Sequence, residues 1–320
     1  MALLLRDALR PNLVQTLEGG PALVHAGPFG NIAHGNSSVV ADVIGIHGGD
    51  YLITEAGFGA DMGAERFFNI KCRTSGLTPD AAVVVCTVRA LKAHSGRHRI
   101  VAGRPLPEAL LAENPDEVHV GGANLRKQIE NIRLHGVSPV VAINAFPGDH
   151  PSEHEAVAAI ASSAGARSAV CTHFADGGAG ATDLAYAVAE AAEEPSRFRF
   201  LYPDSATLRE KIETVATKVY GADGVDYDLA ASRQIDSYEH NGFGRLPVCI
   251  AKTHLSISSD AHLKGAPTGW RLPVREVRAS VGAGFIYPIC GDMRTMPGLG
   301  ADPAAYRIDI DVDGNVVNLS

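Results

Sequence analysis

The stretch Asp50–Phe68, DYLITEAGFGADMGAERFF, suggests the fold class of this chain. A short apolar run, Tyr51–Ile53, ends just before Glu55. A turn with three glycines follows, and then an Ala/Glu/Arg segment with helical character. Strand, glycine-rich turn and helix in this order is the layout in which α/β proteins bind ligands, at the carboxyl end of a buried strand. The stretch therefore predicts an α/β fold with a ligand site at this turn.

Glu55 has two interpretations. A carboxylate at the end of a strand can hold a metal ion or a ligand hydroxyl, and glycines allow the backbone to approach an anion closely. Glu55 is therefore a candidate metal ligand. The alternative is a surface carboxylate beside glycines that only make a tight turn, because a single glycine-rich turn is a weak signal.

The composition is that of a globular protein large enough for two domains. Its 320 residues are 46% hydrophobic and 20% charged, with a net charge of −8, which argues against a nucleic-acid-binding surface. Five cysteines lack metal-ligand spacing and are expected to be buried in a reducing compartment. No run approaches the roughly 20 apolar residues of a membrane span. We expect a cytoplasmic protein without a nucleic-acid or membrane partner.

Apolar runs and helical patterns alternate through the first 200 residues. The predicted strands are 81–87, 139–144 and 168–172, and the helices between and after them are 122–136, 152–164 and 181–193. This alternation predicts a mostly parallel sheet. The β-branched run 81–87 indicates a strand buried on both faces, and residues 95–119 indicate an exposed excursion.

The pattern changes near Tyr202. Two helical stretches are followed by a predicted strand at 246–253 and by two further strands joined at a glycine-rich bend. A hairpin signal at Asp313–Gly314 ends the chain. We therefore expect an α/β domain over residues 1–200 and a smaller α+β domain over residues 201–320.

Three aromatic residues follow predicted strand ends. Phe58, Phe146 and Phe174 each lie beside Gly or Pro or near them, just past an apolar run. Three rings on one rim suggest a stacking platform for a flat heteroaromatic ligand, and the alternative is packing of loops onto the sheet. Arg89 and Lys92 follow the strand 81–87, where they either bind an anion or lie on a solvated helix start.

Longer motifs carry a resemblance to a known family. The pattern V-A-T-[IV]-R-A-L-K-x-[HN]-G-G stands at residues 85–96 as VCTVRALKAHSG, with Cys86 for Ala and Ser95 for the first Gly. Further landmarks stand in the family's order: RPNLVQTLEG (10–19), GPFGNIAHG (27–35), TEAGFGADMGAERF (54–67), VVAINAFPGD (140–149), YGADGV (220–225), LPVCIAKT (246–253), VREVRAS (274–280), TMPGL (295–299) and IDIDVDG (308–314). Over essentially its whole length the chain resembles formate–tetrahydrofolate ligases.

The resemblance implies a fold, a reaction and a set of contacts. The implied fold is an incomplete sheet of the P-loop-NTPase type. Members of the family use ATP with Mg²⁺ to convert formate into formyl phosphate, which N10 of tetrahydrofolate then attacks. By resemblance Phe146 and Phe174 flank the pterin, with Phe58 nearby, although the family often has Trp at position 174. The loop with Pro267, Trp270 and Pro273 matches the region that covers the adenine. A monovalent cation and a homotetramer are also implied.

The resemblance also implies that two family features lie outside this chain. The P-loop lysine and an arginine that helps hold formyl phosphate would precede Met1, and no G-x-x-x-x-G-K-[ST] pattern occurs in the 320 residues. We therefore expect a fragment with negligible ligase activity on its own. The alternatives are a catalytically inactive folate-binding module and a remnant that does not fold.

Overall fold

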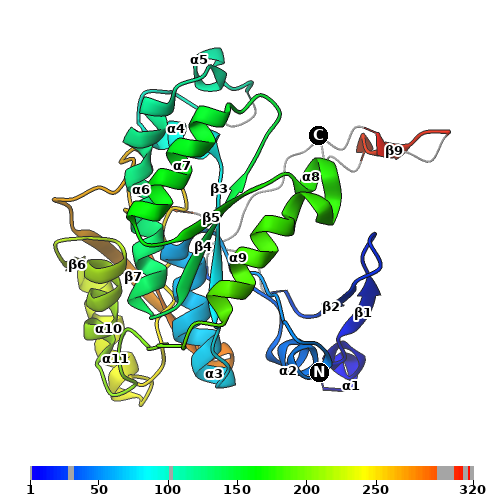
Figure 1. Ribbon diagram of the computed structural model, residues 1–320. Coiled ribbons are helices and arrows are strands. Elements are labelled where there is room, and N and C mark those ends of the chain that lie inside the picture. Colours follow the sequence, from blue (N-terminus) through cyan, green and yellow to red (C-terminus); the bar gives the residue numbers. More distant parts are fainter. Residues whose placement is uncertain (1, 28–31, 101–103, 294–305, 313–315, 318–320) are drawn as a thin grey trace.

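A three-stranded parallel sheet forms the centre of the molecule (Figure 1). The computed structural model describes residues 2–27, 32–100, 104–293, 306–312 and 316–317. Strands β3 (Ala81–Cys86), β4 (Ser138–Asn144) and β5 (Arg167–Cys171) lie in that order, each parallel to its neighbour. The three strands predicted for this part of the chain are confirmed.

Helices cover the sheet from two sides. On one side lie α6 (Pro115–Leu134) and α7 (Pro151–Ser163), which pack against each other, and α9 (Thr182–Ala192) lies on the other side (Figure 1). The central strand β4 is therefore buried on both faces, and its successive residues Val140 and Val141 are both 0% exposed. Short helices α4 (Val88–His94) and α5 (Glu108–Leu111) complete the first side.

The prediction that residues 81–87 are buried on both faces is wrong. Val83 and Val85 of β3 are 44% and 67% exposed. β3 is an outer strand of the sheet, so its side chains have neighbours on one side only, and the described helices leave these two valines uncovered. A β-branched run thus indicated the strand correctly but not its place in the sheet.

The prediction of a strand at Tyr51–Ile53 is also wrong. These residues have no regular secondary structure, and Tyr51 and Ile53 are 62% and 89% exposed. A strand requires a neighbour for its backbone hydrogen bonds, and no described strand pairs with this segment. The helical character predicted after the glycine turn is confirmed. Two π-helical segments, η2 (Gly59–Ala64) and η3 (Phe67–Cys72), lead into the short helix α3 (Arg73–Ser75).

The first part of the chain lies beside the sheet (Figure 1), and Asp42 of its last helix forms a buried ion pair with Lys71 at 2.6 Å. It contains α1 (Ala2–Leu5), η1 (Asp7–Leu9), the antiparallel hairpin of β1 (Asn12–Gln15) and β2 (Pro21–Val24), and α2 (Val39–Gly48). A side-chain cap starts α2, since Ser38 Oγ accepts a hydrogen bond from the backbone N–H of Ala41 at 3.0 Å. Residues 28–31 of the motif 27–35 lie outside the described residues.

The last part of the chain has its own core. A mixed sheet of β6 (Val225–Tyr227), β7 (Leu272–Ser280) and β8 (Phe285–Cys290) packs with α10 (Leu208–Thr214), η5 (Val215–Val219) and α11 (Leu229–His240). The prediction of a strand at 246–253 is wrong, because this apolar run forms no regular strand. It pairs with β8 only through isolated parallel bridges such as Val248–Ile286. The structure is thus α/β, while the boundary at residue 200 and the likeness to P-loop NTPases stay predictions.

Other predictions meet mixed outcomes. The prediction that residues 95–119 form an exposed excursion is wrong for part of that range. It contains α5 and the start of α6, and Leu110 and Val118 in these helices are buried. All five cysteines are buried and free, as predicted.

The motif 295–299 and the turn at Asp313–Gly314 lie outside the described residues, although β9 (Asp309–Ile310) and β10 (Val316–Val317) pair on either side of that turn. No described helix is long and apolar enough to cross a membrane.

Candidate functional site

Two of the three predicted aromatic residues follow neighbouring strands of the parallel sheet. Phe146 comes two residues after β4, and Phe174 lies in α8 (His173–Asp176), just after β5. The backbone N–H of Ala145 donates to the carbonyl oxygen of Cys171 at 3.0 Å, which holds the two strand ends together. Because carboxyl ends of neighbouring parallel strands meet at one edge of a sheet, both aromatic residues lie at that edge.

None of the three predicted rings is sealed inside the core. Phe58, Phe146 and Phe174 are 74%, 38% and 89% exposed. The rings are therefore accessible to a ligand, which packing of loops onto the sheet would have prevented. In the part of the chain that the structure describes, no ring–ring contact joins the three. A shared three-ring platform stays a prediction.

A closed turn positions Phe146. The backbone N–H of Phe146 donates to Asp149 Oδ2 at 3.0 Å, and the backbone N–H of Asp149 donates to the carbonyl oxygen of Phe146 at 3.0 Å. Gly148 adopts a φ of +92°, a conformation that side chains with a Cβ rarely take. The sequence Phe-Pro-Gly-Asp therefore forms a compact turn that presents the ring at the sheet edge.

The two cations that follow β3 have different environments. The guanidinium carbon of Arg89 lies 4.3 Å from the centroid of the Phe146 ring. Lys92 is 1% exposed, forms an ion pair with Glu153 and donates to the carbonyl oxygen of Ala112 at 2.6 Å. The sequence left a choice between an anion-binding pair and a solvated helix start. Lys92 fits neither, because its ammonium is buried and already bonded.

The glycine-rich turn places Phe58 beside a histidine of a distant loop. The rings of Phe58 and His254 stack with centroids 5.5 Å apart and an interplanar angle of 28°. The backbone N–H of Gly63 donates to the carbonyl oxygen of Phe58 at 3.0 Å and closes the turn. Gly59 has a φ of +67°, so the predicted tight turn is confirmed.

A buried ion pair connects this turn to the loop after residue 251. Lys252 Nζ lies 2.7 Å from Asp61 Oδ2 and donates to the carbonyl oxygen of Ser256, also at 2.7 Å. Asp61 Oδ1 accepts from Gln128 Nε2 at 3.0 Å, which adds α6 to the network. Burial lowers the pKa of Lys252, and the carboxylate of Asp61 opposes that shift. The network fixes Phe58 and His254 relative to each other.

Glu55 lies on the surface and does not end a strand. Its side chain is exposed, and the preceding residues have no regular structure. Among the described residues no three of His, Cys, Asp and Glu gather as a metal site requires. A single exposed carboxylate is a poor fit for a resident metal ion, so the role of Glu55 as a ligand stays a prediction.

The residues predicted to cover an adenine lie in and after one loop. Trp270 Nε1 donates to the carbonyl oxygen of Pro267 at 3.1 Å, and the Trp270 ring packs partly buried against the core of the last part of the chain. Pro273 is exposed in β7, where it pairs in register with Asp226. The structure thus brings Pro267 and Trp270 together, and their contact with a nucleotide stays a prediction.

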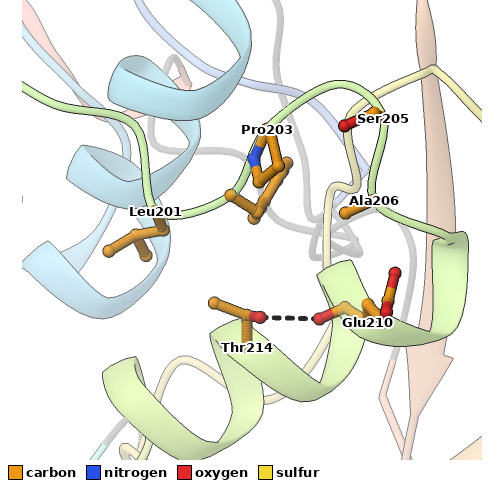
Figure 2. A pocket seen from close by; sticks show the side chains of 7 residues that line it. Leu201, Pro203, Ser205, Ala206, Glu210 and Thr214 are labelled. Carbon is orange, nitrogen blue, oxygen red and sulfur yellow. Dashed lines mark hydrogen bonds between the residues drawn. The ribbon is translucent and has the colours of Figure 1, made fainter.

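The hollows among the described residues include two of different size. The larger, of about 470 Å³, lies where the segment Leu201–Ala206 meets α10, and Figure 2 shows the side chains that line it. It contains one carboxylate, Glu210, and lies apart from the predicted residues in sequence. The smaller, of about 130 Å³, is lined by Arg89, Lys92 and the turn at Pro147–Asp149, so it lies next to Phe146.

Sequence reasoning missed Lys252 and His254 as members of this region. Lys252 lies near the end of the apolar run 246–253 and His254 directly follows it. The structure joins Lys252 to Asp61 and His254 to Phe58. A lysine inside an apolar run, in LPVCIAKT, was the available signal, since a buried lysine needs a partner. The identity of that partner depends on tertiary structure.

The fold and the site define an α/β protein that presents aromatic side chains at the carboxyl edge of a parallel sheet. The family model described as formate--tetrahydrofolate ligase matches residues 1–320. The chain belongs to the formate–tetrahydrofolate ligase family, and the resemblance noted in the sequence is confirmed.

Individual relatives agree with this assignment. The chain is similar to formate–tetrahydrofolate ligase of Saccharopolyspora erythraea, with 72% identity over 320 residues, which cover 100% of this chain and 57% of the relative. Formate–tetrahydrofolate ligase 3 of Rubrobacter xylanophilus is 70% identical over 328 residues, and the enzyme of Cutibacterium acnes is 64% identical over 319 residues. In both, the match covers 100% of this chain and 57% of the relative. The chain thus spans about 57% of the length of these relatives.

Proposed function

We propose that this chain binds tetrahydrofolate and takes part in the ATP-dependent ligation of formate to it, which gives 10-formyltetrahydrofolate through formyl phosphate. The observation that carries the proposal is the family match over residues 1–320 together with the exposure of Phe146 and Phe174 at one sheet edge. Two exposed aromatic rings at one sheet edge offer apolar faces on which a flat heteroaromatic ligand could stack.

The pterin ring would stack at this edge. Phe146 and Phe174 flank it, and Phe58 contributes from the glycine turn. Stacking of a flat heterocycle on an aromatic side chain is favourable for any ring with a π face, so orientation comes from polar groups around the rim. Phe at position 174 offers a smaller face than Trp would, and we therefore propose weaker stacking there.

The nucleotide would lie against the loop that contains Trp270. In this proposal the loop with Pro267, Trp270 and Pro273 covers the adenine. Mg²⁺ would neutralise charge on the phosphates during transfer, and Glu55 is the candidate carboxylate for it or for its water. Because Glu55 is a lone exposed carboxylate, we assign it no step. A monovalent cation, a homotetramer and a cytoplasmic location belong to the same proposal.

For the 320 residues by themselves we propose tetrahydrofolate binding without ligation. The observation that favours this second function is the lack of a G-x-x-x-x-G-K-[ST] pattern in the sequence. Backbone amides and a lysine in such a loop hold the phosphates during transfer, so the reaction needs residues that this sequence does not provide.

Calorimetric titration tests the binding proposal. We expect saturable binding of tetrahydrofolate to the purified chain, and a loss of about tenfold in affinity for Phe146→Ala and for Phe174→Ala. Tyr186→Ala is the matched control, because Tyr186 is an exposed aromatic residue of α9, 69% accessible, outside the proposed site. Equal affinities in all four proteins, or no binding at all, would contradict the proposal.

An activity assay separates the two functions. The chain is incubated with ATP, formate and tetrahydrofolate, and 10-formyltetrahydrofolate is measured by its absorbance after conversion to the methenyl form. We expect folate binding with no turnover. Turnover that depends on both ATP and formate would refute binding without ligation, while supporting the ligase proposal directly.

A further inference from the structure

Arg89 covers one face of the Phe146 ring. Its guanidinium carbon lies 4.3 Å from the ring centroid, which is the geometry of a cation–π contact. The two residues meet because Arg89 lies in the first turn of α4, just after β3, while Phe146 follows β4, the parallel neighbour of β3. With Arg89 on one face and the residue still 38% exposed, we expect the opposite face of the Phe146 ring to be open to a second ring.

Local bonds hold Arg89 in this position. Thr87 Oγ1 accepts from the backbone N–H of Ala90 at 3.1 Å and caps α4, so the helix starts at a defined residue. Arg89 Nη2 donates to the carbonyl oxygen of Pro147 at 3.3 Å, inside the same turn that presents Phe146. The guanidinium is therefore attached to both the strand-end turn and the ring.

The nearby carboxylates are engaged elsewhere. Glu153 pairs with Lys92, and Asp149 Oδ2 accepts from the backbone N–H of Phe146 and lies 3.5 Å from His154 Nε2. Among the described residues Arg89 has no ion pair within 4 Å, and its Nε is buried without a hydrogen-bond acceptor. The positive charge of Arg89 thus acts mainly on the face of the Phe146 ring.

We propose that Arg89 is a positioning and specificity residue that makes the free face of Phe146 selective for an electron-rich ring, the reduced pterin of tetrahydrofolate. This inference rests on the proposed folate site and deepens it. A cation on one face of a benzene ring draws π density toward itself, so the opposite face becomes less negative. That face attracts the electron-rich pyrimidine ring of a tetrahydropterin more strongly than the electron-poor, fully oxidised pterin of folic acid.

The ratio of two affinities tests the proposal. Tetrahydrofolate and folic acid are each titrated calorimetrically into wild type, Arg89→Gln and Arg89→Lys. We expect Arg89→Gln to weaken tetrahydrofolate binding by about fivefold and folic acid binding by less than about twofold, the range of an exposed cation–π contact. Arg89→Lys keeps the charge without the planar group, and it should recover part of the ratio.

A matched control excludes a general effect of losing an arginine on an aromatic ring. Arg209 lies over Tyr227 at 4.9 Å in the last part of the chain, so Arg209→Gln removes the same kind of contact at another place. We expect both affinities to stay as in wild type. Because each ratio is measured in one preparation, a partly unfolded variant changes both affinities equally and leaves the ratio intact.

The outcomes distinguish this inference from the function on which it rests. If Phe146→Ala leaves tetrahydrofolate binding unchanged, the proposed folate site fails, and the role of Arg89 fails with it. If Phe146→Ala weakens binding while Arg89→Gln weakens both ligands by the same factor, or neither, only the specificity role of Arg89 is overturned. A changed ratio that Arg89→Lys partly restores supports it.

Discussion

Gly63 packs directly against the backbone of Gly57. A Cβ atom added to Gly63 would lie 1.8 Å from the carbonyl oxygen of Gly57, far closer than any real contact. Position 63 therefore has no room for a side chain unless the backbone of the turn that carries Phe58 moves. This explains why glycine occupies position 63 inside a buried helical segment, where glycine is otherwise unfavourable.

The first prediction concerns this contact. Gly63→Ala must displace the backbone of the turn, and we expect the free energy of unfolding to fall by about 3 kcal/mol, the upper range for overpacking. Gly282→Ala is the matched control, because a Cβ there meets nothing within 4 Å. Urea denaturation of both variants measures the difference. Equal stability of the two would show that the turn tolerates a side chain.

The second prediction concerns the buried pair of Asp61 and Lys252. Asp61→Asn leaves the ammonium of Lys252, which is 0% exposed, without its counter-charge, and we expect a loss of about 3 kcal/mol in unfolding free energy. Asp226→Asn removes the partner of Arg271 in an exposed pair and should cost no more than about 1 kcal/mol. Thermal melts of the two variants compare them. A smaller loss for Asp61→Asn than for Asp226→Asn would contradict this account.

The third prediction concerns pH. Burial raises the pKa of Glu65 to about 7, while a hydrogen bond from Asn69 opposes the shift. Between the ordinary carboxyl pKa and about 7 the folded state binds the proton more tightly than the unfolded chain does. The stability contributed by this group is therefore present at low pH and is lost as the pH rises toward 7.

Glu65→Gln removes this dependence, because the amide keeps the shape of the acid without its charge. We expect the variant to be more stable than wild type at pH 8, by on the order of 3 kcal/mol, and to differ little at pH 5. Melting curves at the two pH values measure this. If Glu65→Gln destabilises the protein more at pH 8 than at pH 5, the charged form is the stabilising one and the assignment is wrong.

The fourth prediction concerns Phe174. Because its ring is 89% exposed, substitution there changes few internal contacts. Phe174→Trp enlarges the stacking face, and we expect tetrahydrofolate affinity to rise about threefold with an unchanged melting temperature. Calorimetric titration and a thermal melt measure the two quantities. A fall in affinity would place the pterin away from this residue.

The sequence predicted those helices and strands whose formation depends mainly on neighbouring residues in the chain. The apolar runs 139–144 and 168–172 indicated strands because their residues suit a buried sheet. Tyr51–Ile53 has the same local character but no neighbouring strand among the described residues, and pairing cannot be inferred from the run itself.

The candidate site was likewise predicted only in part, because some of its contacts join residues that are far apart in the chain. Phe146 and Phe174 were found from their places after strands, and the family motifs gave their expected role. The contact of Arg89 with Phe146 and the pair of Asp61 with Lys252 join residues far apart in the chain. Such contacts depend on strand order and on loop packing, which no local pattern encodes.

The uncovered outer strand has a practical consequence for handling the protein. In the described part of the chain no strand pairs with the free side of β3, and its Val83 and Val85 face solvent. Unpaired backbone groups beside exposed valines invite another polypeptide to add itself to the sheet. We expect self-association that grows with protein concentration, visible by light scattering, and Val85→Lys should suppress it.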